Sequence, residues 1–172
     1  MTIALYFPMK TPDDPVASGD REMARLLVRI IERLGETPVL ASRLRTWRAA
    51  PDTAAFAALQ AESSREADRL IAGWRDGNDR PTAWVTYHLY HKAPDWIGPR
   101  VASALDIPYV VVEASRALKR ATGPWAPGFS ACDRALAAAD AVVAMHAEDR
   151  AGLADVVAAD RLFTLIPFID TA

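Results

Sequence analysis

Short, strongly apolar segments alternate with longer amphipathic segments along this chain, and this alternation restricts its possible folds more than any other feature. The apolar segments lie at residues 2–7, 37–41, 83–87, 107–112, 141–145 and 162–166. The central ones are apolar on both faces of a strand, as in parallel sheets covered by helices on both sides. Six strands alternating with helices predict an α/β fold, a doubly wound and mostly parallel six-stranded sheet with helices on both faces.

The segments between these strands have helical periodicity and recognisable ends. Ser18 is the expected N-cap of the first helix and Gly35 its C-cap. Asp52 or Thr53 is expected to cap the second helix, which is long and runs to Trp74. Further helices are expected at residues 99–105, 129–139 and 147–157.

Length and charge place the chain in a broad class and exclude several others. Its 172 residues correspond to one domain at about 150 residues per domain. Twenty basic and 22 acidic side chains give a net charge of −2, without the overall excess of positive charge that is typical of nucleic-acid-binding proteins. No apolar run approaches the roughly 20 residues of a membrane span, and the N-terminus lacks a basic leader. The prediction is a soluble, cytoplasmic, single-domain protein without a nucleic-acid partner.

Polar and charged residues gather in the loops that follow the predicted strands. In a doubly wound sheet, ligands bind in the crevice beyond the carboxyl ends of the strands, where these loops meet. The loops contain all three histidines, and the opposite turns are short. They also contain eight basic residues: Lys10, Arg43, Arg45, Arg48, Lys92, Arg116, Lys119 and Arg120. An electropositive functional edge is therefore expected, although longer loops also gather polar residues by chance.

The loop after the first strand leads into a helix through Ser18 and Gly19. The free N–H groups and dipole of a helix N-terminus favour an anion, so these two residues are candidates for binding a phosphate. The segment matches neither of the glycine-rich phosphate motifs, and it could equally be a simple capped helix start. Asp20, in the first helical turn, would repel a phosphate unless it points away.

Two histidines follow the third strand. His88 and His91, with Lys92 beside them, are candidates for acid–base work, for recognition of sugar hydroxyls or for neutralisation of a phosphate. One of the two histidines is also expected to have a structural role in its loop. Their spacing of three residues would permit a metal pair, but no third ligand is clearly placed, so neither a metal nor a cofactor is expected.

The loop after the fourth strand begins with Glu113 and continues with Arg116 and Arg120. A carboxylate at a strand end could act as a base or bind sugar hydroxyls, and the arginines could hold a phosphate or carboxylate. The alternative is an internal ion pair between Glu113 and Arg116 or Arg120 that pins the loop.

Several segments, in order and spacing, resemble a known enzyme family. They are residues 3–7 (IALYF), 17–21 (ASGDR), 87–88 (YH), 107–112 (IPYVVV), 139–144 (ADAVVA) and 165–170 (LIPFID). Together they resemble the N-terminal domain of family 4, or group 1, glycosyltransferases of the GT-B fold. The last segment is similar to the one that leads from the first domain of that family into the second.

The resemblance implies a Rossmann-like, acceptor-binding half of an enzyme that transfers a sugar from a nucleotide-sugar donor to an acceptor. Residues 1–172 would form this half, with 165–172 beginning the linker to a C-terminal donor-binding domain, and the half alone is expected to be inactive. The acceptor would be a sugar or a lipid-linked sugar, and the full enzyme could associate peripherally with a membrane.

The resemblance also assigns expected roles to residues at the predicted edge. Ser18 and Gly19 would approach the donor diphosphate, and His88 would line the cleft between the domains. The family often has a histidine where this chain has Glu113, so His88 and Glu113 are both catalytic candidates. The candidates for binding the acceptor or an anion are His91, Lys92, Arg116 and Arg120.

Two other functions remain open at this point. The same sheet pattern suits a stand-alone flavodoxin-like module that binds a nucleotide or flavin, although the first loop lacks the Ser/Thr-rich phosphate cradle of such proteins. It also suits a regulatory domain without catalytic activity. Fold alone does not separate these functions, because this architecture hosts many.

Overall fold

The computed structural model describes residues 1–75, 77 and 79–166, and it confirms the predicted α/β, Rossmann-like fold. The strands are β1 (Thr2–Tyr6), β2 (Thr37–Ser42), β3 (Ala83–Leu89), β4 (Tyr109–Ala114), β5 (Ala141–Ala144) and β6 (Leu162–Thr164). The helices are α1 (Gly19–Arg33), α2 (Thr53–Arg75), α3 (Gly98–Leu105), α4 (Ala126–Ala138) and α5 (Ala147–Leu153), with short 3₁₀ turns at Leu118–Arg120 and Gly123–Trp125.

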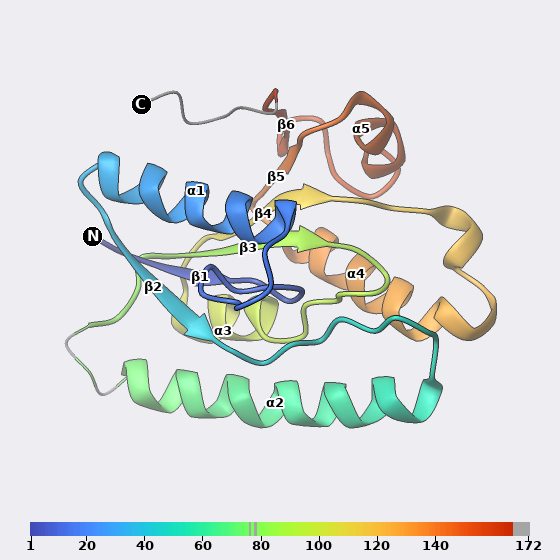
Figure 1. The fold of residues 1–172 in the computed structure, drawn as a ribbon, viewed down its shortest axis with the longest axis horizontal. Coiled ribbons are helices and arrows are strands. Elements are labelled where there is room, and N and C mark those ends of the chain that lie inside the picture. Colours follow the sequence, from blue (N-terminus) through green and yellow to red (C-terminus); the bar gives the residue numbers. More distant parts are fainter. Residues whose placement is uncertain (76, 78, 167–172) are drawn as a thin grey trace.

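The six strands form one sheet in the order β2-β1-β3-β4-β5-β6, and every neighbouring pair is parallel. The chain leaves β1 for β2 on one side and later returns to place β3 on the other side. The order therefore reverses between β1 and β3, and such a switch point is where ligands bind in sheets of this type. Figure 1 shows the carboxyl ends of the strands and the beginning of α1 at the same edge of the sheet.

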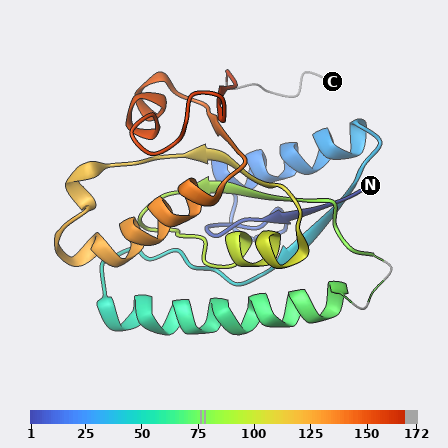
Figure 2. The ribbon, with the colours of Figure 1, turned by 180° about the vertical axis from the view of Figure 1, so that it is seen from behind.

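Helices cover the two faces of the sheet unequally. Figures 1 and 2 show α1 over one face and α2, α3 and α4 over the other. The core on the α1 side contains Leu5, Phe7, Ala24, Tyr87, Val112 and Met145. The larger core on the opposite side includes Trp84, Leu89, Val111, Ala114 and Leu136. We call them the α1-side core and the α2-side core.

The helix ends follow the sequence closely. The Ser18 hydroxyl caps α1 by accepting a hydrogen bond from the backbone N–H of Arg21, and Gly35 follows the helix with a φ of 78°. The Asp52 carboxylate accepts from the N–H of Ala55 at the start of α2. These contacts confirm Ser18 and Asp52 as caps, whereas the C-cap of α1 is Leu34, one residue before the predicted Gly35.

Some boundaries differ from those predicted. The fourth strand was expected to begin at Ile107, but Ile107 donates its backbone N–H to Ala102 and so closes the end of α3. The last helix ends at Leu153 rather than at residue 157. Of the predicted linker at 165–172, residues 167–172 lie outside the described part of the chain.

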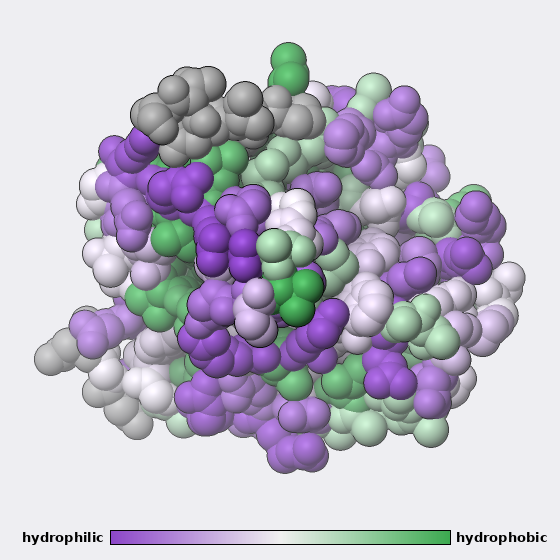
Figure 3. Space-filling model, viewed as in Figure 1, coloured by the Kyte–Doolittle hydropathy of each residue, from purple (hydrophilic) through white to green (hydrophobic). Residues whose placement is uncertain are grey.

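The described surface gives no sign of a membrane-spanning segment. Among residues 1–75, 77 and 79–166, no helix is both long and apolar enough to cross a bilayer. On the face in Figure 3, hydrophilic residues cover much of the centre, and hydrophobic residues are scattered between them.

Candidate functional site

Two residues with left-handed backbone conformation lie opposite each other at the carboxyl edge of the sheet. His88 in β3 has a φ of 62° and Glu113 in β4 a φ of 57°. The strands pair at Tyr87 with Val112 and again at Leu89 with Ala114, so His88 and Glu113 occupy the same level between these pairs. Both lie inside their strands, whereas the sequence suggested that they begin the loops.

The left-handed residue of each strand shifts the alternation of side chains by one position. Tyr87 belongs to the α1-side core, and Leu89, two residues later, belongs to the α2-side core. Val112 and Ala114 show the same change in β4. Residues two apart in a regular strand share a face, so each strand contains one extra residue here. The extra residues, His88 and Glu113, are therefore released from both cores.

His88 is held by a carboxylate from α1. Its Nδ1 lies 2.6 Å from Oδ1 of Asp20, and the two side chains are 22% and 25% exposed. Asp20 favours the tautomer with a proton on Nδ1, which leaves Nε2 as a proton acceptor. From the sequence, Asp20 is expected only to repel a phosphate at the helix start. The one available signal was its place in the first turn of the helix.

Aromatic side chains hold the other side of the His88 ring. Tyr90 stacks on it with ring centres 4.8 Å apart. The Tyr90 hydroxyl accepts a hydrogen bond of 2.9 Å from Nε1 of Trp47 and contacts Sδ of Met9 at 3.3 Å. Three loops, those after β1, β2 and β3, thus meet around one imidazole and fix its orientation.

Glu113 lies beside a buried phenol. Burial raises the pKa of Tyr87 well above its usual range, and the neighbouring Glu113 carboxylate raises it further. The Tyr87 hydroxyl therefore remains protonated and can donate a hydrogen bond. Glu113 forms no ion pair with a described residue, so the alternative interpretation of this loop, an ion pair with Arg116 or Arg120, is wrong.

The backbone at the beginning of α1 is not covered by other side chains. The first turn of this helix also contains Asp20, which contacts His88. Ser18 Oγ accepts from Arg21 N at 3.3 Å, and Gly19 is the first residue of the helix. A Cβ placed on Gly19 would have no heavy atom within 4 Å. Protein packing thus leaves space at Gly19, in the position where the sequence predicted a phosphate.

Arg116 is occupied within the protein. Its guanidinium makes two hydrogen bonds to the Asp133 carboxylate, at 2.9 and 3.0 Å, and one to Asp155 at 3.2 Å. It also lies 5.2 Å above the Phe129 ring, and its side chain is only 9% exposed. These contacts hold the β4–α4 loop against α4. Arg116 differs from the other predicted anion-binding residues because its guanidinium is already bound by two aspartates.

The loop after β3 is fixed by a buried carboxylate. Asp95 Oδ1 accepts from the N–H groups of Ile97 and Gly98, and Oδ2 accepts from the hydroxyls of Thr86 and Tyr109. Burial raises the pKa of Asp95, against the opposing effect of these hydrogen bonds. The network fixes the beginning of α3, whereas the turn with His91 and Lys92 is held by backbone hydrogen bonds from Ala93 to Tyr90 and from Arg48 to Lys92.

His91, Lys92 and Arg120 lie together at this edge. Burial lowers the pKa of His91, and the positive charges of Arg120, Lys92 and Lys119 lower it further, in that order. The ring of His91 packs edge-on against Trp125, and Lys92 Nζ lies 5.5 Å from the centre of that ring. The two predicted histidines thus occupy two adjoining but different environments.

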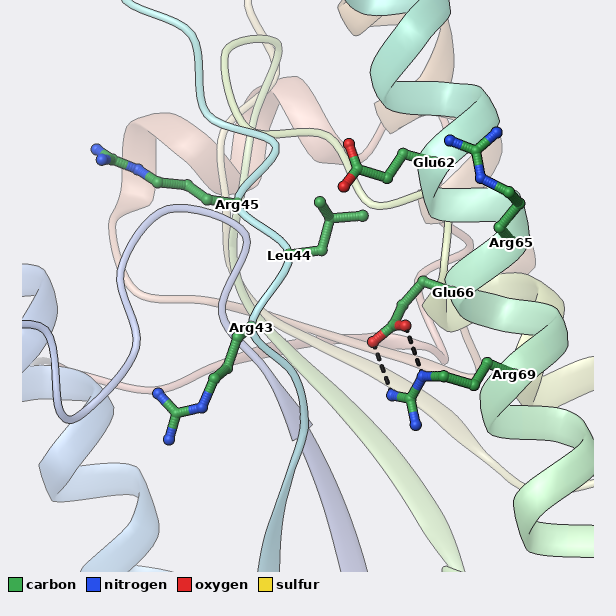
Figure 4. Close-up of a pocket in the computed structure, with 7 residues that line it drawn as sticks. All are labelled: Arg43, Leu44, Arg45, Glu62, Arg65, Glu66 and Arg69. Atoms are coloured by element: carbon green, nitrogen blue, oxygen red, sulfur yellow. Dashed lines mark hydrogen bonds and ion pairs between the residues drawn. The ribbon is translucent and has the colours of Figure 1, made fainter.

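A cavity of about 490 Å³ lies away from these residues, between the β2–α2 loop and α2. Figure 4 shows the Glu66–Arg69 ion pair on the α2 side of the cavity. The side chains of Arg43 and Arg45 point away from α2. Arg43 reaches Asp13 at 2.5 Å. None of the predicted site residues lines this cavity.

Metal-ligating residues do not converge in the described part of the chain. No three His, Cys, Asp or Glu side chains of residues 1–75, 77 and 79–166 are close enough to share a metal ion. The chemistry available at the edge is that of an oriented imidazole, a carboxylate, open helix N–H groups and basic side chains.

Comparison with known proteins shows a likeness in structure alone. No protein-family model matches the sequence, and no curated protein sequence does. A UDP-glucosyltransferase from Polygonum tinctorium capable of glucosylating indoxyl, solved in complex with 3,4-dichloroaniline, matches in structure with a TM-score of 0.51 and 11% identity. The match covers 99% of this chain and 53% of that one, so the chain spans about half of the length of this neighbour. This likeness concerns the fold alone: the α/β fold of this chain resembles about half of the neighbour.

Proposed function

We propose that this chain is the acceptor-binding half of a GT-B glycosyltransferase, which transfers a sugar from a nucleotide-sugar to an acceptor hydroxyl. The half-length likeness to a UDP-glucosyltransferase supports the fold part of this proposal. The observation that carries the chemical part is the 2.6 Å contact between His88 and Asp20 beside the switch point. The donor-binding half would be supplied by a second domain, and residues 165–172 would begin the connection to it.

In this proposal His88 is the residue that takes the acceptor proton. Its Nε2 accepts the hydroxyl proton while the hydroxyl oxygen bonds to the anomeric carbon of the donor. The bond from that carbon to the diphosphate breaks, and the nucleoside diphosphate leaves. Asp20 is a positioning residue, which holds Nδ1–H and stabilises the imidazolium that forms. Glu113, at the same level of the sheet, would bind a sugar hydroxyl or serve as the alternative base.

The beginning of α1 is the proposed site of the donor diphosphate. The backbone N–H groups at Ser18 and Gly19 and the positive end of the helix dipole favour negative charge. The Asp20 carboxylate, which would otherwise oppose a phosphate, interacts with His88. The proposal therefore has the Asp20 carboxylate turned toward His88 and the helix N–H groups left for the diphosphate.

The test is sugar transfer by the longer protein that joins this chain to a donor-binding domain. Replacement of His88 by Ala should lower the rate of transfer by about 10²–10⁴-fold, as is typical for loss of a general base. Asp20→Asn should lower kcat and leave the KM for the donor nearly unchanged. His146→Gln is the matched control, because His146 is an exposed histidine outside the proposed site.

Unchanged transfer by the His88→Ala variant would show that His88 is not the base, and Glu113→Ala would then be examined as the alternative. Residues 1–172 alone should catalyse no transfer, since orienting donor and acceptor requires both sides of the cleft. Full turnover by this chain would contradict the division into two halves.

A second candidate function is favoured by the strand order. From β2 to β5 the sheet has the 2-1-3-4-5 order of flavodoxin-like proteins, in which FMN binds at the β1/β3 switch point. Stabilisation of the chain by FMN, but not by nucleotide-sugars, would favour such a binding module. Stabilisation by neither would favour a regulatory domain.

A further inference from the structure

Four basic side chains at the carboxyl edge form a cluster without acidic partners. We call His91, Lys92, Lys119 and Arg120 the basic cluster; the first two follow β3 and the others follow β4. Within the described residues, none of the four makes an ion pair. Arg116, four residues before Arg120, is by contrast paired with two aspartates. The positive charges of Lys92, Lys119 and Arg120, which add to the effect of burial in lowering the pKa of His91, repel one another unless an anion offsets them.

Two nitrogen atoms of the basic cluster are buried without a hydrogen-bond partner in the described residues. They are Nε2 of His91 and Nε of Arg120. An unsatisfied buried polar group typically costs about 1–3 kcal/mol, so native structures rarely retain one without a reason. Guanidinium and ammonium groups of the same cluster are the usual donors to a phosphate or carboxylate.

The basic cluster is held rigidly. The ring of His91 lies 5.1 Å from that of Trp125, which is itself buried against Phe56 at 5.9 Å. Gly128 of α4 packs so closely beneath this turn that a Cβ there would be 2.1 Å from the carbonyl oxygen of His91. The turn is thus fixed before any ligand arrives, and such preorganisation lowers the entropy cost of binding.

A chain of ring contacts connects the basic cluster to His88. Tyr90 stacks on His88 at 4.8 Å and packs edge-on against His91 at 5.5 Å. Tyr90 therefore contacts both His88 and the His91 ring of the basic cluster. The 490 Å³ cavity between the β2–α2 loop and α2 offers no such connection, and its Glu66 and Arg69 neutralise each other.

We propose that the acceptor is acidic, a sugar that carries a phosphate or carboxylate group, and that Lys92, Arg120 and Lys119 hold this group while a hydroxyl reaches His88. This inference rests on the proposed function, because it names the class of acceptor. Arg120 supplies paired N–H donors that match a phosphate or carboxylate, and Lys92 supplies a point charge above Trp125.

Binding to the chain without any donor tests the inference. The chain is titrated with glucose 6-phosphate, glucuronate, glucose and inorganic phosphate, and the resonances of His88, His91 and the Trp125 indole are followed by NMR. Either or both of the acidic sugars should bind and shift signals at both His91 and His88, whereas glucose should shift neither. Arg120→Gln and Lys92→Gln should each weaken binding by about 10-fold or more, as for loss of a charge-assisted hydrogen bond.

Arg80→Gln is the control, since Arg80 is exposed at the amino end of β3, on the opposite edge of the sheet. Circular dichroism establishes that each variant is folded. Equal affinity of Arg120→Gln and the unchanged chain would overturn the inference, as would equal weakening by Arg80→Gln. Inorganic phosphate that binds as tightly as the sugar phosphate and leaves His88 unshifted would overturn it too, because the cluster would then recognise no acceptor.

The two proposals fail separately. The titration needs no transfer, so Arg120-dependent binding of an acidic sugar could coexist with unchanged transfer by the His88→Ala enzyme. That pair of results would retain the acidic ligand and reject His88 as the base. The opposite pair of results is loss of transfer with His88→Ala and equal binding of the acidic sugar by Arg120→Gln and the unchanged chain. It would support His88 as the base and reject the acidic acceptor.

Discussion

His88 and Glu113 adopt a backbone conformation that side chains rarely accept. For a residue with a Cβ the left-handed region costs about 1–2 kcal/mol, because the Cβ crowds the following carbonyl. The pairing of β3 with β4 on both sides of the two residues forces this conformation. Strain of this kind is tolerated where structure surrounds it, and it clusters at functional sites. Its occurrence at two facing positions agrees with the role proposed for this edge.

Glycine at position 113 should relieve the strain. The Glu113→Gly variant should be about 1 kcal/mol more stable than Glu113→Ala, because alanine keeps the Cβ that left-handed backbone disfavours. Urea denaturation of the two variants measures this difference. The same comparison at Glu62, which is exposed in α2, should have the opposite sign, since glycine is about 1 kcal/mol less favourable than alanine in a helix. Equal stability of the two variants at position 113 would exclude strain there.

The sequence indicates His88 as a candidate, but it does not indicate the residue that contacts it. A polar residue at the end of an apolar strand can be recognised from the sequence alone. The doubly wound pattern places such a residue at the carboxyl ends of the strands, where ligands bind. Asp20 is 68 residues away, and its contact with His88 depends on β1 and β3 being neighbours. For the same reason, periodicity could not show that Arg116 pairs with Asp133 while Arg120 makes no ion pair with a described residue.

Among the elements, the long helices and buried strands were predictable because their periodicity extends over many residues. The predicted boundaries of helices and strands are wrong where local hydrogen bonding competes with that pattern. Ile107 is β-branched and adjoins an apolar run, yet it belongs to the turn that ends α3. Asp106, with a φ of 50°, forms the left-handed cap of that turn. A non-glycine residue in this conformation leaves little trace in the sequence.

The packing of α4 beneath the His91 turn can be tested with two glycines. Gly128→Ala should destabilise the chain by about 3 kcal/mol, near the upper end for overpacking, because backbone atoms would have to move. Gly73→Ala in α2 is the control, since a Cβ there meets nothing within 4 Å and alanine favours the helix. It should stabilise the chain by up to about 1 kcal/mol. Chemical denaturation of both variants gives the comparison, and a neutral Gly128→Ala would show that α4 packs loosely.

For the whole molecule, strand order determines which residues can meet, and alternation alone does not specify it. The sequence therefore predicted a doubly wound sheet without locating its switch point between β1 and β3. Hydrophobic patterning determines which faces are buried, whereas the order depends on which crossovers pack best in three dimensions. The sequence therefore predicts the edge of the sheet at which the candidate site lies, but not which side chains contact one another there.

Stability should be distributed unevenly across the sheet. Strands β1, β3, β4 and β5 have strand neighbours on both sides, whereas β6 has three residues, pairs only with β5 and leaves Phe163 52% exposed. Amide hydrogen exchange should be slowest in β1, β3 and β4 and much faster in β6. Protection of β6 equal to that of β3 would mean that the sheet opens only as one unit.

The matched extra residues of β3 and β4 also restrict how this chain can change length during evolution. Loss of His88 alone would bring Leu89 opposite Glu113 instead of Ala114, and pairing beyond that point would be displaced by one position. Loss of both residues would leave the ladder intact. Substitutions at this edge can therefore accumulate one at a time, whereas deletions are tolerated by the sheet only in pairs.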